Sequence, residues 1–137
     1  MLIKNINDQE YQIQELKVEL KKLNNKKILL TGGLGFLGYN FLLLFNFLIT
    51  NKKYNINIIV YDIVDKKKLP SWFLNLNKKI TYKKENIIDK KNFPNVDYII
   101  HAASIASPTY YRKYPIETMD ANVIGLRNLL DFYKNKK

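Results

Sequence analysis

A glycine-rich turn between an apolar strand and an apolar helix constrains this sequence more than any other feature. Residues 27–31 read Lys-Ile-Leu-Leu-Thr, which is typical of a buried strand, and residues 36–49 are apolar nearly all round, as in a helix covered on most sides. Between them stand Gly32, Gly35 and Gly38. A strand, a tight glycine turn and a helix in this order predict the first unit of a parallel α/β sheet.

The rest of the chain continues the alternation of strands and helices. We expect strands at 56–62, at 80–85 near an edge, and at 96–103 in a buried position. Residues 66–77 indicate a loop with a short helix, and residues 115–133 a helix that starts at a proline. The predicted fold class is α/β: a Rossmann-type parallel sheet with helices on both faces, incomplete, with about four strands in the order 3-2-1-4.

Residues 1–25 predict a helical extension that precedes a domain over 26–137. Asn7 can cap this helix, and Glu10 stands three residues later, as in a capping box. Four apolar side chains then recur at helical spacing: Ile13, Leu16, Leu20 and Leu23. We expect this stripe to pack on the main domain or on a partner subunit.

The glycine turn also predicts a ligand. Gly32 permits a tight turn, and Gly35 lets the backbone approach a pyrophosphate, because a Cβ there would collide with it. Gly38 allows the helix to pack closely on the strand. The N–H groups of Gly35, Phe36 and Leu37 would face the anion at the positive end of the helix dipole. The turn therefore predicts a dinucleotide site; the alternative is a glycine turn kept for packing alone.

Asp62 indicates which dinucleotide is bound. It ends the second predicted strand, 24 residues after Gly38, near the separation that the dinucleotide fingerprint requires. A carboxylate there accepts hydrogen bonds from both ribose hydroxyls and repels a 2′-phosphate, so NAD is favoured over NADP. The alternative is a solvated acid at a strand end.

The ends of the third and fourth strands supply the rest of the cleft, because ligands of such sheets bind beyond the carboxyl ends of the strands. Asn86 and Ile87 follow the third strand, where an adenine would lie. Small residues after the fourth leave room for a ribose and a nicotinamide: Ala102, Ala103 and Ser104. We interpret His101 as a hydrogen-bonded core histidine.

Composition narrows the class of protein. The chain has 137 residues, which suits one domain, and no cysteine and one histidine, which exclude thiolate and multi-histidine zinc sites. Its net charge of +11 comes almost entirely from scattered lysines, a pattern that does not favour nucleic-acid binding. The most apolar run, 36–49, is too short to span a bilayer, and no secretory signal is visible. We therefore expect no membrane partner and a cytoplasmic location.

Two stretches of sequence resemble a known family. The first is the turn Thr31-Gly32-x-x-Gly35-x-x-Gly38, and the second is the run from His101 to Leu130, HAASIASPTYYRKYPIETMDANVIGLRNLL. Both resemble the extended short-chain dehydrogenase/reductase family, also called the NAD-dependent epimerase/dehydratase family. The second is most similar to its UDP-glucuronate decarboxylase branch. The resemblance extends from about Lys26 to the C-terminus.

The resemblance implies a role for each matching residue. The pyrophosphate would contact Gly35, Phe36 and Leu37, and the adenosine ribose would contact Asp62 and Ile63. The adenine would contact Ile87 and Asn86, which replaces the usual Asp of the family. The nicotinamide side would be lined by Ala102 and Ser104, with Asn122 nearby. A nucleotide sugar, expected to be a UDP-sugar, would contact Ala106 and Tyr111.

The chemistry that the resemblance implies is oxidation at C4 of the sugar by NAD, followed by decarboxylation. The family performs it with a Tyr-x-x-x-Lys pair beyond the helix that ends this sequence. We therefore expect a domain truncated before that pair, with no catalytic residue in this chain and no activity alone. A UDP-glucose 4-epimerase-like or dTDP-glucose 4,6-dehydratase-like fragment and a non-catalytic NAD-binding or scaffold module remain alternatives. A homodimer or a complementing C-terminal half is the expected partner.

Overall fold

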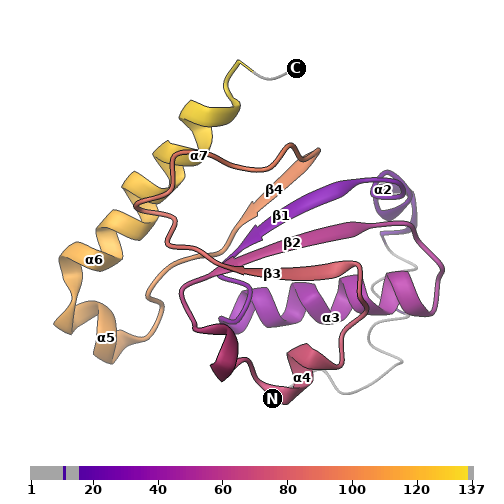
Figure 1. The fold of residues 1–137 in the computed structure, drawn as a ribbon, viewed down its shortest axis with the longest axis horizontal. Coiled ribbons are helices and arrows are strands. Elements are labelled where there is room, and N and C mark those ends of the chain that lie inside the picture. Colours follow the sequence, from indigo (N-terminus) through magenta and orange to yellow (C-terminus); the bar gives the residue numbers. More distant parts are fainter. Residues whose placement is uncertain (1–10, 12–15, 136–137) are drawn as a thin grey trace.

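Four parallel strands form one sheet at the centre of the structure. The computed structural model describes residue 11 and residues 16–135. Its strands are β1 (Lys27–Thr31), β2 (Asn57–Asp62), β3 (Ile80–Lys84) and β4 (Tyr98–His101). Their order is β3-β2-β1-β4, and every adjacent pair is parallel (Figure 1). The predicted strand order is confirmed.

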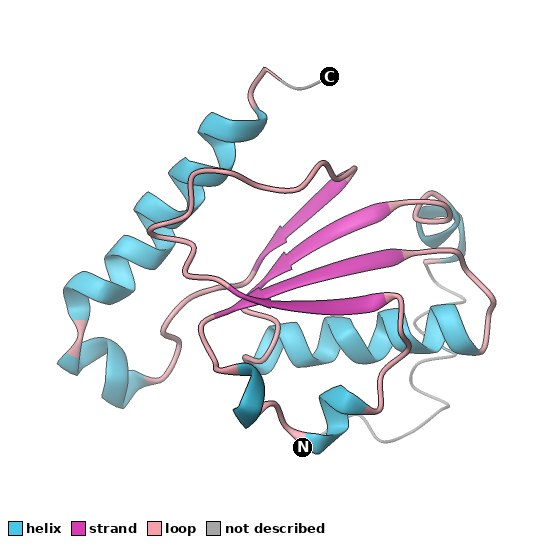
Figure 2. Cartoon of the chain, in the orientation of Figure 1, coloured by secondary structure: helices cyan, strands magenta, loops and turns pink. Residues whose placement is uncertain are grey.

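Helices cover both faces of this sheet (Figure 2). The long helix α3 (Phe36–Thr50) lies on one face. On the other lies the helical segment made of α6 (Pro115–Asp120), the π-helical turn η2 (Ala121–Gly125) and α7 (Leu126–Tyr133). Shorter elements complete the described chain: α2 (Lys17–Lys21), η1 (Lys66–Lys68), α4 (Ser71–Leu74) and α5 (Pro108–Lys113). This is the predicted Rossmann-type architecture; α5 is an addition to it.

The core lies on both sides of β1. Ile28 and Leu30 pack in the cluster that contains α3 side chains, whereas Leu29 packs in the cluster that contains Leu129 of α7. All four side chains are at most 1% exposed. Burying each of them stabilises the fold by about 1.5–3 kcal/mol. A strand buried on both faces needs a continuous apolar run, which explains the pattern of residues 28–30.

The fourth strand differs from its prediction. It spans Tyr98–His101 instead of 96–103, and it is not fully buried, because Tyr98 is 42% and Ile99 37% exposed. The reason is its position: β4 is hydrogen-bonded to β1 on one side and forms an edge of the sheet on the other. An apolar run in a sequence indicates a strand but does not reveal which strands are at the edges.

The N-terminal stripe is confirmed in part. Leu20 of α2 is buried in the core cluster of α3, and Leu23 packs against that cluster. Leu16 is 46% exposed. The predicted cap at Asn7 with Glu10, and Ile13, lie outside the described residues. Among the helices of the described chain, none combines the length and the apolar character that a membrane crossing requires.

Candidate functional site

The glycine turn joins β1 to α3 at the carboxyl edge of the sheet. Gly32 has φ +69°, a left-handed conformation that a side chain makes costly. A Cβ on Gly32 would also lie 2.6 Å from the carbonyl carbon and oxygen of Ala102. The N–H of Gly32 donates to the Tyr61 carbonyl oxygen at 2.8 Å. The predicted tight turn is confirmed, and it lies against the end of β4.

Three further glycines of the turn have different neighbours. A Cβ on Gly38 would lie 2.2 Å from the Gly32 carbonyl oxygen, so glycine at position 38 lets α3 pack closely against the turn. A Cβ on Gly33 would lie 2.3 Å from Val60 of β2, a packing role that sequence reasoning missed. A Cβ on Gly35 would approach only the Gly32 oxygen, at 3.3 Å. Packing within the protein is thus less restrictive at position 35 than at positions 33 and 38.

The start of α3 is open. Gly35 occupies the N-cap position and has no side chain to bond the first N–H groups of the helix. Phe36 and Leu37, the first two helical residues, are 75% and 59% exposed. An uncapped helix N-terminus carries partial positive charge and N–H donors, which is the chemistry that binds a phosphate group.

The carboxylate of Asp62 lies against this turn. Its Oδ2 accepts a hydrogen bond from the Leu34 N–H at 2.9 Å, and its Oδ1 accepts one from the Val64 N–H at 3.4 Å. Asp62 is half-buried, whereas its neighbour Ile63 is 67% exposed. The structure therefore gives Asp62 a role that the sequence did not predict: it holds the middle of the glycine turn.

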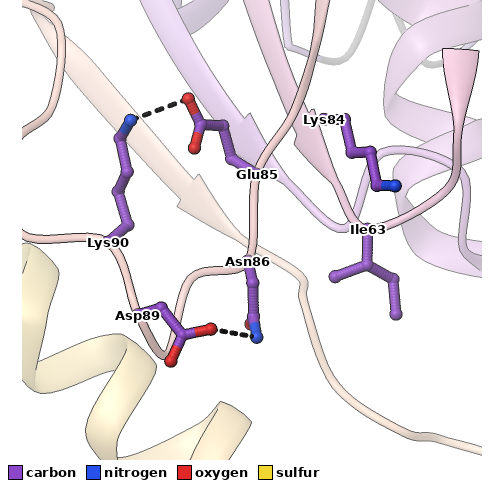
Figure 3. Close-up of a pocket in the computed structure, with 6 residues that line it drawn as sticks. All are labelled: Ile63, Lys84, Glu85, Asn86, Asp89 and Lys90. Atoms are coloured by element: carbon purple, nitrogen blue, oxygen red, sulfur yellow. Dashed lines mark hydrogen bonds and ion pairs between the residues drawn. The ribbon is translucent and has the colours of Figure 1, made fainter.

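A pocket of about 510 Å³ opens beyond the ends of β2 and β3 (Figure 3). It is lined by Ile63, Lys84, Glu85, Asn86, Asp89 and Lys90. Of the predicted adenosine contacts, Ile63 and Asn86 are therefore brought to one hollow. The side chain of Ile87 is 5% exposed and faces the core, where a Cβ on Gly125 would lie 2.7 Å from it. Any ligand contact of Ile87 would come from its backbone.

His101 ends β4 and is bonded to the end of β1. Its Nδ1 lies 2.7 Å from the Thr31 Oγ1. Its Nε2 is buried and has no hydrogen-bond partner among the described residues. Burial lowers the pKa of His101, and the backbone carbonyl of Ala121 opposes that effect. The predicted hydrogen bond of His101 is confirmed, whereas the residue is half-buried and not part of the core.

The loop after β4 contacts the helix that covers it. The Asn122 Nδ2 donates to the Ser104 Oγ at 2.9 Å and to the Thr118 carbonyl at 2.7 Å. Two of the residues predicted for the nicotinamide side are thus brought together. The other two, Ala102 and Ala103, are half-buried beside Gly32. The predicted sugar contacts, Ala106 and Tyr111, are exposed, and neither lines the pocket of Figure 3.

The spacing Tyr-x-x-x-Lys does occur in the chain, at Tyr133 and Lys137, contrary to the expectation that it is absent. The Tyr133 hydroxyl donates to the Pro94 carbonyl, and burial raises the pKa of Tyr133 to about 12. A catalytic base needs a lowered pKa, so Tyr133, which is half-buried and packs against the core cluster of Leu129, does not fit that role. Lys137 lies outside the described residues.

A second hollow, of about 610 Å³, lies along the outer edge of β4. Lys27 and Asp97 line it, and both stand at the amino ends of their strands. Parallel α/β sheets bind their ligands at the carboxyl ends of the strands. This hollow is therefore not the dinucleotide site, although it is larger than the pocket at the ends of β2 and β3.

Most of this chain is similar to part of several known proteins. A model of the 3-beta hydroxysteroid dehydrogenase/isomerase family matches residues 29–136. UDP-glucuronic acid decarboxylase 6 of Arabidopsis thaliana is 33% identical over 112 residues, which are 81% of this chain and 31% of that protein. The dTDP-D-glucose 4,6-dehydratase of Dictyostelium discoideum is 31% identical over 135 aligned residues, covering 84% of this chain and 29% of the relative. The chain thus spans about three tenths of the length of these relatives.

Solved structures give the same result for the fold. The UDP-N-acetylglucosamine 4-epimerase of Methanobrevibacter ruminantium, in complex with UDP-N-acetylmuramic acid, superposes with a TM-score of 0.61 at 26% identity. The superposition covers 82% of this chain and 35% of the epimerase. The similarity confirms the Rossmann-type fold and the resemblance to epimerases and decarboxylases that the sequence indicates.

Proposed function

Because this chain belongs to the 3-beta hydroxysteroid dehydrogenase/isomerase family, we propose that it binds NAD and supplies the cofactor-binding part of a nucleotide-sugar enzyme. The observation that carries this proposal is the open start of α3 behind the turn at residues 32–38. Gly35 has no side chain over the first N–H groups of the helix, and only the Gly32 carbonyl oxygen, at 3.3 Å, lies near the place of a Cβ. N–H groups at the start of a helix fit a diphosphate.

The residues around the turn fit the rest of NAD. Phe36 and Leu37 would bind the diphosphate through their N–H groups, and Asp62 would accept the ribose hydroxyls with the lone pairs that Leu34 and Val64 leave free. A carboxylate at that position disfavours a 2′-phosphate, which supports NAD over NADP. Ser104 and Asn122, held together by their hydrogen bond, would line the nicotinamide side.

The reaction we propose is that of a UDP-glucuronate decarboxylase. The 33% identity to such an enzyme supports this branch. When bound, NAD supplies an acceptor for hydride from C4 of the sugar. This chain would hold the cofactor in place and keep it oriented, with Ala106 and Tyr111 toward the sugar. We propose that the catalytic Tyr and Lys belong to polypeptide outside this sequence, because the Tyr133 hydroxyl is bonded to the Pro94 carbonyl and its ring packs against the core.

Two neighbouring activities are supported by specific relatives. One relative is a dTDP-D-glucose 4,6-dehydratase and one similar structure is a UDP-N-acetylglucosamine 4-epimerase, so dehydration or epimerisation of the 4-keto sugar are the alternatives. The branches are separated by product analysis of the completed protein with UDP-glucuronate, UDP-glucose and dTDP-glucose. Release of CO₂ from UDP-glucuronate supports the decarboxylase branch, and its absence contradicts it.

We propose that a further polypeptide segment completes the sheet. The outer edge of β4 exposes Tyr98 and Ile99, and an exposed strand edge offers unpaired backbone groups to another strand. A complementing C-terminal half would cover it.

A homodimer through the exposed side of the helix at 115–133 is the other partner arrangement we consider. Its apolar side chains recur at intervals of three and four residues: Ile116, Met119, Val123, Leu126 and Leu130.

Calorimetric titration of the chain with NAD and with NADP tests the proposed cofactor. We expect saturable binding of NAD at one site and binding of NADP at least about 10-fold weaker, which corresponds to about 1.4 kcal/mol. A folded chain that binds neither dinucleotide would contradict the proposal. A folded chain that binds NAD, but turns over no nucleotide sugar even with its downstream sequence added, would favour a non-catalytic NAD-binding module.

A further inference from the structure

A tyrosine of β3 is hydrogen-bonded to the backbone at the end of β2 and just beyond it. Tyr82 lies on the edge strand β3, beside β2 (Figure 1). Its hydroxyl donates to the Val64 carbonyl oxygen at 2.5 Å, and the Asp62 carbonyl oxygen lies 3.2 Å from the same hydroxyl. The backbone from residue 62 to residue 64 therefore bends around the phenol oxygen.

Of the two carbonyl groups, that of Val64 depends more on the phenol. A tyrosine hydroxyl has one hydrogen to donate. The Asp62 carbonyl oxygen also accepts a hydrogen bond from the Glu85 N–H at 2.9 Å, so it keeps a partner without the phenol. Within the part of the chain that the structure describes, the Val64 carbonyl oxygen has Tyr82 as its hydrogen-bond donor and no second one. Loss of the hydroxyl would thus release the backbone at Val64.

The phenol itself is held in place and stays protonated. Its ring is half-buried, packs against the core cluster of α3, and meets the ring of Phe73 edge to face with 5.6 Å between the ring centroids. Burial raises the pKa of Tyr82 to about 12, with smaller contributions from the carboxylates of Asp62 and Asp65. At neutral pH the hydroxyl is therefore a donor to the backbone.

Val64 links this phenol to the carboxylate of Asp62. The carbonyl of Val64 accepts from Tyr82, and its N–H donates to the Asp62 Oδ1 at 3.4 Å. The other carboxylate oxygen accepts from the Leu34 N–H of the glycine turn at 2.9 Å. The three bonds connect β3 to the glycine turn, so Tyr82 helps to fix the carboxylate of Asp62 through the backbone.

The residues after Val64 carry the opposite charge. The Asp65 carboxylate accepts a hydrogen bond from the Lys67 N–H at 2.9 Å and so caps η1, whose three residues Lys66–Lys68 are all exposed lysines. A carboxylate beside the ribose repels a 2′-phosphate, whereas an ammonium group attracts one. The path of the backbone between Asp62 and η1 therefore decides which charge lies nearer to the 2′ position.

We propose that Tyr82 is a positioning residue that sets the preference for NAD over NADP, because it holds Asp62, through Val64, against the glycine turn. The inference rests on the proposed NAD site and adds to it a residue that acts through Asp62. A fixed carboxylate accepts hydrogen bonds from the ribose hydroxyls and excludes a 2′-phosphate. A carboxylate that moves does both less well, so loss of the phenol hydroxyl weakens NAD binding more than NADP binding.

Calorimetric titration of the whole chain with NAD and with NADP measures this preference as the ratio of the two dissociation constants. We expect the ratio to fall at least about fivefold in Tyr82→Phe. Tyr54→Phe is the matched control, because Tyr54 is a half-buried tyrosine that packs against the same core cluster and precedes the amino end of β2. It loses the same hydroxyl and leaves the ratio unchanged. Urea denaturation confirms that both variants are folded.

A second pair of chains distinguishes positioning from a general loosening of the structure. General loosening weakens both dinucleotides alike and leaves the ratio unchanged. If Tyr82 acts through the carboxylate, its hydroxyl has little left to position in the Asp62→Asn background. We therefore expect Tyr82→Phe to change the ratio there by less than about twofold, which is within the ordinary additivity of independent substitutions.

The possible outcomes separate this inference from the proposed function. A folded Tyr82→Phe chain that keeps the wild-type ratio overturns the role of Tyr82 and leaves the NAD site intact, as does a wild-type chain that binds both dinucleotides equally. A fall of about fivefold that persists in the Asp62→Asn background overturns the action through Asp62. A wild-type chain that binds neither dinucleotide overturns the NAD site and this inference with it.

Discussion

The carboxylate of Asp62 and the backbone N–H of Leu34 are joined by a hydrogen bond of 2.9 Å that links the end of β2 to the glycine turn. The residue that we expect to bind the adenosine ribose is therefore also the residue that positions the loop for the diphosphate. A charged acceptor makes a stronger hydrogen bond than a neutral one, so this link adds rigidity to the turn before any ligand binds.

Substitution of Asp62 separates its two roles. Asp62→Ala leaves the Leu34 N–H without its acceptor, and we expect it to lower the free energy of unfolding by about 1.5–3 kcal/mol and to weaken NAD binding. Asp62→Asn keeps one acceptor oxygen for Leu34, so it retains most of the stability but still weakens NAD binding. Urea denaturation and calorimetry measure the two effects. Equal NAD affinity in all three chains would contradict the ribose role.

We expect substitutions at two glycines of the turn to differ in their effects on stability and on NAD binding. Gly35→Val meets only one oxygen at 3.3 Å, so we expect it to cost about 1 kcal/mol of stability and to weaken NAD binding at least about 10-fold. Gly38→Val places a Cβ 2.2 Å from the Gly32 oxygen and is expected to destabilise the fold by about 3 kcal/mol. Thermal melting and titration with NAD distinguish the two variants. A Gly35→Val chain with normal affinity would argue against a diphosphate at the turn.

We expect His101, the single histidine, to make the stability of the fold depend on pH. Burial lowers the pKa of His101 below its unfolded value of 6.5, so at mildly acidic pH the unfolded chain holds more protons than the folded one. The contribution of neutral His101 to the free energy of unfolding is fully present above pH 6.5. It is lost as the pH falls through 6.5 toward the lower pKa of the folded chain. Aspartates whose pKa is lowered from 3.8, such as Asp97, make stability depend on pH only in more acidic solution.

Urea midpoints between pH 7.5 and pH 5 measure this effect. We expect the wild-type midpoint to fall across this range, and the midpoint of His101→Gln to fall less because that chain has lost its only imidazole. A wild-type chain with the same midpoint at both ends of the range would show that the folded protein accommodates a charged His101.

Tyr133 is expected to behave as a structural phenol. Tyr133→Phe removes the hydrogen bond to Pro94 and should lower the free energy of unfolding by about 1 kcal/mol near pH 7. Tyr110→Phe is a control at a side chain that is 58% exposed. Absorbance titration of the phenols should show one fewer group ionising near pH 12 in Tyr133→Phe, because the raised pKa keeps Tyr133 protonated well above pH 10. Early ionisation of Tyr133 would contradict its burial.

The central part of the fold could be predicted from the sequence because its signals are local. The run at 27–31, the glycine spacing and the apolar helix after it each depend on neighbouring residues, and together they require a strand, a turn and a helix. The parallel order then follows from general rules of handedness. The helix α5 was not predicted, although Pro108 stands at its first turn, where proline favours a helix start.

The contacts between strands could not be predicted in the same way. The packing of Gly33 on Val60 and the bond from Leu34 to Asp62 depend on the register of β1 against β2, which a single strand pattern does not contain. The exposure of β4 depends on what lies beside it in the sheet. The spacing of Tyr133 and Lys137 shows the converse: a motif without its structural context carries no catalytic meaning.

A structure of the chain determined after soaking with NAD tests the central claim most directly. The account predicts the diphosphate against the first turn of α3, within hydrogen-bond distance of the N–H groups of Phe36 and Leu37, with a ribose hydroxyl on Asp62. A turn that stays empty at saturating NAD, or a dinucleotide bound elsewhere on the chain, would contradict it.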